Sequence, residues 1–152
     1  MSAFQSFRIS ASGLTAERLR MDVISNNLAN ANTTRTEDGE PYRRQFPVFA
    51  PLEESAAPGR NSQHSFGVKA AGSGPVGSGV RVVGIEEDAG PPRLKYDPEH
   101  PDANAEGYVE MPKVHVVKEM VDLIGAARAY EANITAINSA KSMAQKALEI
   151  GR

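Results

Sequence analysis

The chain has 152 residues and a net charge of −2, which suits one domain with extended ends and argues against a broad basic surface for nucleic acid. It contains no cysteine, which excludes disulfides, thiolate catalysis and cysteine zinc sites. No stretch approaches the ~18 apolar residues that a membrane span needs, and the first residues lack the apolar core of a cleaved secretory signal.

Proline and glycine divide the chain into three parts. All ten prolines and ten of the thirteen glycines lie between residues 39 and 112. Because proline removes a backbone donor and glycine weakens helices, this middle part cannot be a long helix. We expect a mainly α fold with a small β part. Residues 1–34 and 113–152 would form long helices packed as a coiled coil, and residues 35–112 a loop-rich β subdomain.

The first expected helix runs from about Phe4 to Ala31. Eight of its positions alternate steps of three and four residues, which is the a/d spacing of a coiled-coil seam, and six of the eight are apolar. These seam positions are Phe4, Phe7, Ala11, Leu14, Arg18, Met21, Ser25 and Leu28.

The strands expected in the middle are short. They span Tyr42–Phe49, Val80–Ile85 with Gly84 as a possible bulge, and Arg93–Tyr96. Residues 53–79 are rich in glycine, serine, alanine and proline, so we expect a long mobile loop there.

The last expected helix runs from about Val114 to Leu148 and repeats the same alternation, with nine of ten seam positions apolar. Val117, Val121 and Ile124 widen the apolar stripe in its first half. The seam positions are Val116, Met120, Leu123, Ala127, Tyr130, Ile134, Ile137, Lys141, Ala144 and Leu148.

The length of the second helix indicates assembly. At 1.5 Å per residue it is roughly 50 Å long, about three times the average for a compact domain. We expect the two seams to cover each other, in a parallel or antiparallel pair, with outer faces left for neighbouring chains. Periodicity alone leaves open a simpler alternative, in which the helical pair serves only as a core.

The sequence offers little chemistry for catalysis or cofactors. Gly72, Gly74 and Gly77 match the G-x-G-x-x-G pattern of dinucleotide sites, but Pro75 interrupts it and a strand rather than a helix follows. His100 lies among acids in a turn-rich loop, without a second histidine nearby or the spacing of an EF-hand. No serine has the flanking sequence of a nucleophile elbow. We expect no enzyme activity, no cofactor and no metal.

Both ends carry extended motifs. Residues 13–34 read GLTAERLRMDVISNNLANANTT, with SNNLAN at 25–30 as their core, and resemble the N-terminal signature of flagellar rod, hook and related axial proteins. Residues 111–124, MPKVHVVKEMVDLI, and 128–133, RAYEAN, resemble the C-terminal signature of the same family. The short middle part makes the chain most similar to the proximal-rod branch.

This resemblance implies a structural role. Such proteins are exported unfolded by the flagellar type III apparatus without signal cleavage and assemble in the periplasm. The implied partners are other rod subunits and further copies of the chain, with the export apparatus or MS ring at the base and the distal rod above. The terminal helices would form an inner layer around a channel, and the middle an outer domain.

The asparagines that end the first helix, Asn26, Asn27, Asn30 and Asn32, have amides that both donate and accept hydrogen bonds. Between packed helices they would fix register, as a buried asparagine does in a coiled coil; the alternative is a solvated helix end. The expected assembly interface comprises Phe4, Phe7, Leu14, Met21, Asn26, Asn27, Leu28, Asn30, Val116, Met120, Leu123, Ala127, Tyr130, Ile134, Ile137 and Leu148.

Two other functions remain open from the sequence. One is a different flagellar axial protein, such as another proximal rod subunit or an adaptor. The other is a soluble coiled-coil adaptor that forms closed dimers. A rod subunit makes head-to-tail contacts that propagate, so sedimentation alone and with partner rod proteins would separate the two classes.

Overall fold

The protein is described by a computed structural model that covers residues 3–52 and 77–150. Most of the loop expected over residues 53–79, together with Gly72 and Gly74, therefore lies outside the described residues. The elements in chain order are α1 (Ala3–Ala29), β1 (Gln45–Pro51), β2 (Val80–Glu87), β3 (Arg93–Tyr96), β4 (Tyr108–Met111) and α2 (Val116–Ile150).

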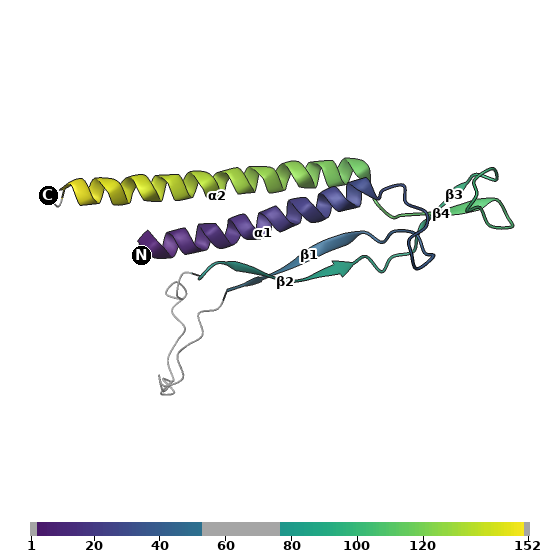
Figure 1. Ribbon diagram of the computed structural model, residues 1–152, viewed down its shortest axis with the longest axis horizontal. Coiled ribbons are helices and arrows are strands. Elements are labelled where there is room, and N and C mark those ends of the chain that lie inside the picture. Colours follow the sequence, from purple (N-terminus) through teal and green to yellow (C-terminus); the bar gives the residue numbers. More distant parts are fainter. Residues whose placement is uncertain (1–2, 53–76, 151–152) are drawn as a thin grey trace, which may run out of the picture.

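The two helices lie side by side and antiparallel, so that both termini lie at one end of an elongated molecule (Figure 1). Gly13 on α1 faces Asn133 on α2, and Asn27 bonds to Glu119. The distance from 13 to 27 along α1 and from 133 back to 119 along α2 is fourteen residues in each case, as expected for an antiparallel pair. By this register α1 begins level with residue 143, and the last turns of α2 extend beyond it (Figure 1). The fold is mainly α with a small β part, as the sequence predicted.

Small side chains dominate the contact between α1 and α2. Ala16 on α1 and Ala126 and Ala140 on α2 are buried. A Cβ atom added to Gly13 would lie 3.0 Å from the side-chain amide atoms of Asn133, so the backbones approach closely there. Small residues on facing surfaces allow two helices to approach in this way.

The β1–β2 hairpin lies along α1 on the side away from α2, so α1 is sandwiched (Figure 1). Among the helices and strands of residues 3–52 and 77–150, α2 packs on α1 alone. Ser12 joins the helix to the hairpin: its hydroxyl donates to the Ile9 carbonyl (2.7 Å) and accepts from the Val80 N–H (3.0 Å). Gly79, just before β2, has φ +120° and packs directly against Ser12. A side chain at this position would meet both backbone strain and steric overlap.

The strands are antiparallel, and a bulge interrupts β2. Val48 pairs with Gly84 and Phe49 pairs with Val82, so Val83 is the extra residue. The strand therefore contains a bulge, but at Val83 and not at Gly84, where the sequence predicted it; Gly84 is paired with Val48, and the space beside it is open and would accept a side chain. β1 begins three residues later than expected.

The β3–β4 pair forms a head at the end opposite the termini (Figure 1). The bounds of β3 match the prediction, and β4 was not predicted. Tyr96 pairs with Tyr108 across the hairpin, and Val109 on the other face of the pair is buried. Within the described residues, neither helix has a long enough apolar stretch to cross a membrane.

Candidate functional site

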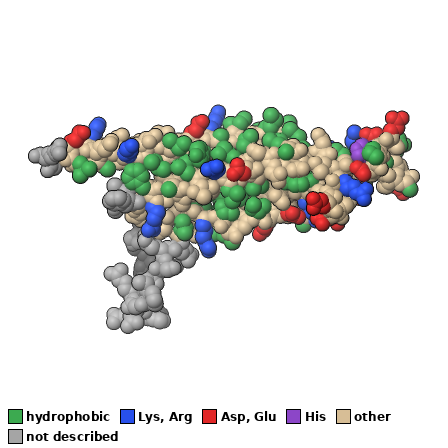
Figure 2. Space-filling model, in the orientation of Figure 1, with side chains coloured by type: hydrophobic (Ala, Val, Ile, Leu, Met, Phe, Trp, Pro, Cys, Tyr) green, Lys and Arg blue, Asp and Glu red, His purple; other side chains and the backbone are tan. Residues whose placement is uncertain are grey.

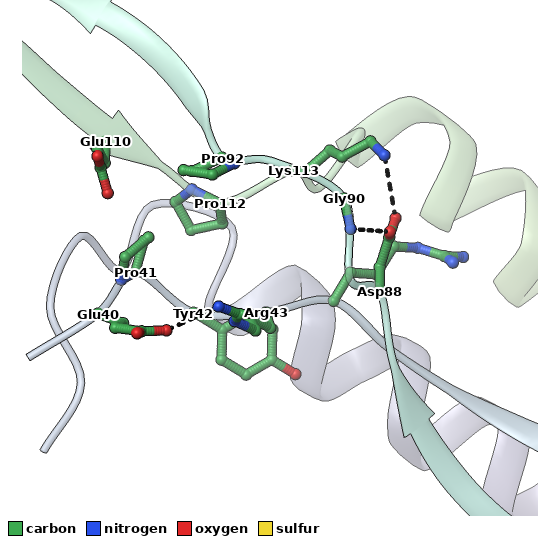
Figure 3. A pocket seen from close by; sticks show the side chains of 11 residues that line it. Glu40, Pro41, Tyr42, Arg43, Asp88, Gly90, Pro92, Glu110, Pro112 and Lys113 are labelled. Atoms are coloured by element: carbon green, nitrogen blue, oxygen red, sulfur yellow. Dashed lines mark hydrogen bonds and ion pairs between the residues drawn. The ribbon is translucent and has the colours of Figure 1, made fainter. Parts of the chain in front are cut away.

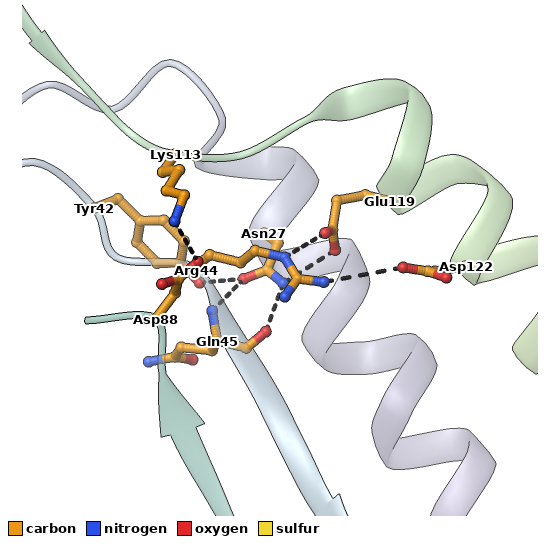
Figure 4. A network of polar contacts seen from close by, with 8 residues as sticks. All are labelled: Asn27, Tyr42, Arg44, Gln45, Asp88, Lys113, Glu119 and Asp122. Carbon is orange, nitrogen blue, oxygen red and sulfur yellow. Dashed lines mark hydrogen bonds and ion pairs between the residues drawn. The ribbon is translucent and has the colours of Figure 1, made fainter. Parts of the chain in front are cut away.

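A buried asparagine ties the end of α1 to the segment that enters β1. The Asn27 amide nitrogen donates to the Gln45 carbonyl (2.7 Å) and to Glu119 Oε2 (3.1 Å). Its oxygen accepts from the Gln45 N–H and from the Tyr42 hydroxyl, both at 2.9 Å (Figure 4). The amide thus uses both donors and both acceptor positions, so its burial leaves no polar group unsatisfied.

A buried carboxylate on α2 completes this junction. Glu119 lies in the first turn of α2 and is fully buried. The Arg44 Nε–H donates to its Oε1 at 2.6 Å, and a second guanidinium nitrogen of Arg44 lies 3.9 Å from Asp122 (Figure 4). A buried charge is tolerated only when it is paired and hydrogen-bonded, which Arg44 and Asn27 accomplish together. We call Asn27, Tyr42, Arg44, Gln45 and Glu119 the polar junction.

The Tyr42 hydroxyl keeps its proton in this environment. Burial raises the pKa of Tyr42, and the carboxylates of Glu87 and Glu119 raise it further. A protonated hydroxyl can donate to Asn27, so the electrostatics favour the hydrogen bond that the geometry contains.

A second cluster joins the end of β2 to the start of α2. Asp88 accepts the Gly90 N–H at 2.8 Å, and its other oxygen lies 3.4 Å from the Lys113 ammonium (Figure 3). The Gly90 bond, and then Lys113 and Arg44, hold the pKa of the Asp88 carboxyl below its usual value. The Asp88 N–H also donates to the Arg44 carbonyl at 2.7 Å, which connects this cluster to the polar junction.

The hollow between these segments has a volume of about 220 Å³ and charged residues of both signs around it (Figure 3). Its charges pair with one another, as Glu40 with Arg43 at 2.9 Å and Asp88 with Lys113. Ligand pockets are usually larger and mostly apolar. The arrangement therefore suits a structural joint between segments better than a small-molecule site.

The predicted asparagines divide into two groups. Asn27 is buried and fixes α1 against β1 and α2 of its own chain. Asn26 and Asn30 act locally: Asn30 Nδ2 donates to the Asn26 carbonyl and to its side chain, both at 3.0 Å, while Asn26 donates to Tyr42 at 3.2 Å. Asn32 follows in the turn and is exposed. A role in register between subunits remains a prediction.

On α2 the predicted interface residues fall on two sides of the helix. Leu123, Ala127, Tyr130 and Ile137 are half-buried. Val116, Met120, Ile134 and Leu148 are exposed. The positions that are most buried, at 119, 126 and 140, each precede a predicted seam position by one residue. The predicted seam is thus rotated by about 100° from the face that meets α1.

On α1 the predicted phase of the intrachain seam is wrong. The buried positions are Ala16, Val23, Ile24 and Asn27, and none of them is a predicted seam position. The predicted residues Phe7, Leu14, Met21 and Leu28 are half-buried, and the side chain of Phe4 lies outside the described part. The reason is physical: α1 is covered from two sides, and its contact with α2 uses small and polar side chains rather than large apolar ones.

Sequence reasoning missed four members of the polar junction: Tyr42, Arg44, Gln45 and Glu119. The one usable signal was Glu119, an acid that interrupts the apolar run of Val116, Val117, Met120 and Val121. Its partner Arg44 is 75 residues away, and no local pattern points to it.

One histidine, His100, takes part in the hydrogen bonding of a turn. His100 Nδ1 accepts the Asp102 N–H at 3.1 Å and lies 3.9 Å from the Asp102 carboxylate. Among residues 3–52 and 77–150, no three His, Asp or Glu side chains converge as metal ligands. His64 lies outside the described residues.

Comparison with known proteins identifies the family. Residues 7–35 match the model described as "Flagella basal body rod protein", and residues 105–150 match "Flagellar basal body rod FlgEFG protein C-terminal". The polar junction spans both matches, through Asn27 and Glu119.

Three full-length relatives carry the name "Flagellar basal-body rod protein FlgC". The relative from Borreliella burgdorferi is 51% identical over 99% of this chain and 98% of its own length. Those from Bacillus subtilis and Escherichia coli O6:H1 are 53% and 40% identical, each over 100% of both chains. The chain therefore belongs to the FlgC family of flagellar basal-body rod proteins.

Proposed function

We propose that the chain is a structural subunit of the proximal part of the flagellar rod, where its terminal helices pack with those of neighbouring subunits into an inner layer around the axial channel. Family membership supports a place in the rod and a role in motility. The long antiparallel helices support the proposed packing of terminal helices between subunits. Rod proteins are structural components, and we expect no catalytic activity.

The observation that carries the proposal is an apolar stripe on α2, on the side opposite α1. Val117, Met120, Val121 and Ile124 form it, and their exposed fractions are 77%, 54%, 64% and 55%. Steps of three and four residues place all four on one side of the helix. Figure 2 shows apolar side chains gathered over this part of the molecule.

The stripe is exposed within the described chain, because α1 is the one helix or strand that packs on α2 and the hairpin lies beyond α1. Complete burial of a valine, isoleucine or methionine side chain contributes about 1.5–3 kcal/mol, so covering the exposed part contributes on the order of 1 kcal/mol for each side chain. Four such residues together would stabilise a subunit contact substantially. Contiguous apolar surface of this kind usually marks an interaction site.

The partners follow from the same role. Other rod subunits and further copies of this chain would cover the stripe, with the export apparatus or MS ring at the base and the distal rod above. The chain would leave the cytoplasm through the flagellar export apparatus without signal cleavage and fold in the periplasm as it joins the rod.

The test is a charge placed in the stripe. Val121→Asp should leave the isolated chain as stable as the parent, because Val121 is largely exposed, but should abolish incorporation into basal bodies because a carboxylate would be buried at the contact. Thr135→Asp is the control, since Thr135 is exposed and lies about four turns further along the same side of α2. Basal bodies purified from a strain carrying only the variant report incorporation. Normal rods with Val121→Asp would rule out the stripe as a subunit contact.

A further inference from the structure

One face of the β3–β4 hairpin is largely apolar, and the rest of the described chain leaves its apolar side chains exposed. Antiparallel pairing sets Tyr96 opposite Tyr108 and Leu94 opposite Glu110, so these four side chains share a face. The exposed fractions of Leu94, Tyr96 and Tyr108 are 60%, 65% and 39%. The opposite face is packed, since Val109 is buried. We call Leu94, Tyr96, Tyr108 and Glu110 the head face.

The head face is rigidly built. The rings of Tyr96 and Tyr108 meet edge to face, with centroids 5.3 Å apart and planes at 67°. Gly107 has φ +82°, and a Cβ atom there would lie 2.9 Å from the Tyr96 ring, so the ring rests over the turn. Aromatic rings that are already ordered lose little entropy when a partner covers them, which is why tyrosine is frequent at contact hot spots.

Charge restricts the kind of partner. The segment from residue 96 to residue 110 holds five acids and no lysine or arginine; Lys95 pairs with Asp97 and Arg35 with Asp102, so acidic and basic side chains both stand at this end of the molecule, with acids in excess within the segment (Figure 2). On the head face itself, Glu110 is the one charged side chain. The complementary partner is therefore an apolar surface that carries basic groups.

The far end of the same molecule displays such a surface. The last turns of α2 extend beyond the start of α1, and Met143, Leu148 and Ile150 are largely exposed there (Figure 1). Lys141 and Lys146 accompany them, against one acid, Glu149. The head face and this helix end lie at opposite ends of the elongated molecule, so they cannot meet within one chain (Figure 1).

We propose that the head face is a docking surface for the free end of α2 of a second copy of this chain, with the apolar and lysine side chains that this helix end displays. The inference rests on the proposed function, and it adds a contact separate from the α2 stripe. A contact between opposite ends is head-to-tail and does not close on itself, so it propagates along the rod. The apolar side chains would supply affinity, and the acids around the head would orient the helix end.

A site-specific crosslink tests the contact directly. Cells would carry, as their only copy, the chain with photoreactive p-benzoylphenylalanine in place of Tyr96. Basal bodies would be purified and illuminated, and the crosslinked peptides identified by mass spectrometry. We expect peptides from the last turns of α2 of a second copy of this chain. Crosslinks to another region of the chain, to a different protein, or to no protein at all would overturn the proposal.

Charge variants give an independent readout. Glu110→Lys should lower the number of completed rods per cell several-fold, because it sets a lysine against a basic helix end. Glu37→Lys, an equal charge change at an exposed position that is not part of the head face, should leave rods near the parental number. Equal counts for the two variants, with equal melting temperatures, would overturn the proposal. If the unmodified chain were absent from basal bodies, the proposed function itself would fail; a chain present there but crosslinked elsewhere refutes this inference alone.

Discussion

Removing the buried carboxylate of the polar junction should be among the most damaging single changes to the isolated chain. Glu119→Ala deletes the acceptors of Arg44 Nε at 2.6 Å and of Asn27 Nδ2 at 3.1 Å, and leaves Arg44 with only Asp122 at 3.9 Å. Breaking a buried ion pair from one side costs about 3–5 kcal/mol. Because 21% of the Arg44 side chain reaches solvent, we expect the lower end, about 3 kcal/mol. That is a large part of the roughly 5–15 kcal/mol that holds a domain folded.

The amide variant refines this prediction. Glu119→Gln keeps the volume and one acceptor, but presents a donor to either Arg44 or Asn27, so it should cost about 1.5–3 kcal/mol. Glu131→Ala is the control: Glu131 is exposed on the same helix, and its loss should cost about 0.5 kcal/mol or less. Urea unfolding followed by the helical circular dichroism signal measures all three. A cost for Glu119→Ala no greater than for Glu131→Ala would refute the claim that the junction holds α2 to the rest of the chain.

Two further predictions concern the hairpin and its ends. The pKa of Asp88 is lowered, first by the Gly90 N–H, so the ionised carboxylate stabilises the folded chain at neutral pH. This stabilisation is lost as the pH falls below about 4, the usual pKa of an aspartate. The urea midpoints of the parent and of Asp88→Asn should therefore converge between pH 7 and pH 3. A difference between the two urea midpoints that stays the same over this pH range would contradict the predicted pH dependence. Gly79→Ala should cost about 1–3 kcal/mol, since Gly79 has φ +120° and abuts Ser12, whereas Gly39→Ala, with φ +82° but open space around it, should cost about 1 kcal/mol. Equal costs measured by urea unfolding would show that the contact with Ser12 is unimportant.

Composition predicted the fold class because proline and glycine act on the backbone locally, wherever they occur in the chain. Proline fixes φ and removes a donor wherever it stands, so the proline-free ends had to be the long helices. β3 was found because its alternation is local too. β4 was missed because it has four residues, of which Glu110 is polar and Met111 has no strand preference, so only its pairing with β3 defines it.

The phase of the helices and the polar junction could not be predicted in the same way. Spacing shows where large apolar residues recur, but α1 and α2 meet through Gly13, Ala16 and Ala126, which carry almost no hydrophobic signal. Val117, Met120, Val121 and Ile124 of α2 point outward instead. The junction depends on pairs far apart in the chain, such as Arg44 with Glu119, and a hydrogen bond of that kind is fixed by the tertiary arrangement rather than by a motif.

The outward stripe of α2 is the central element of the proposed assembly, and a density map of purified basal bodies that resolves side chains would test it most directly. The account predicts that α1 and α2 lie in the inner layer of the rod and that Val117, Met120, Val121 and Ile124 are covered by a helix of another subunit. A rod in which these four side chains face open solvent would contradict it.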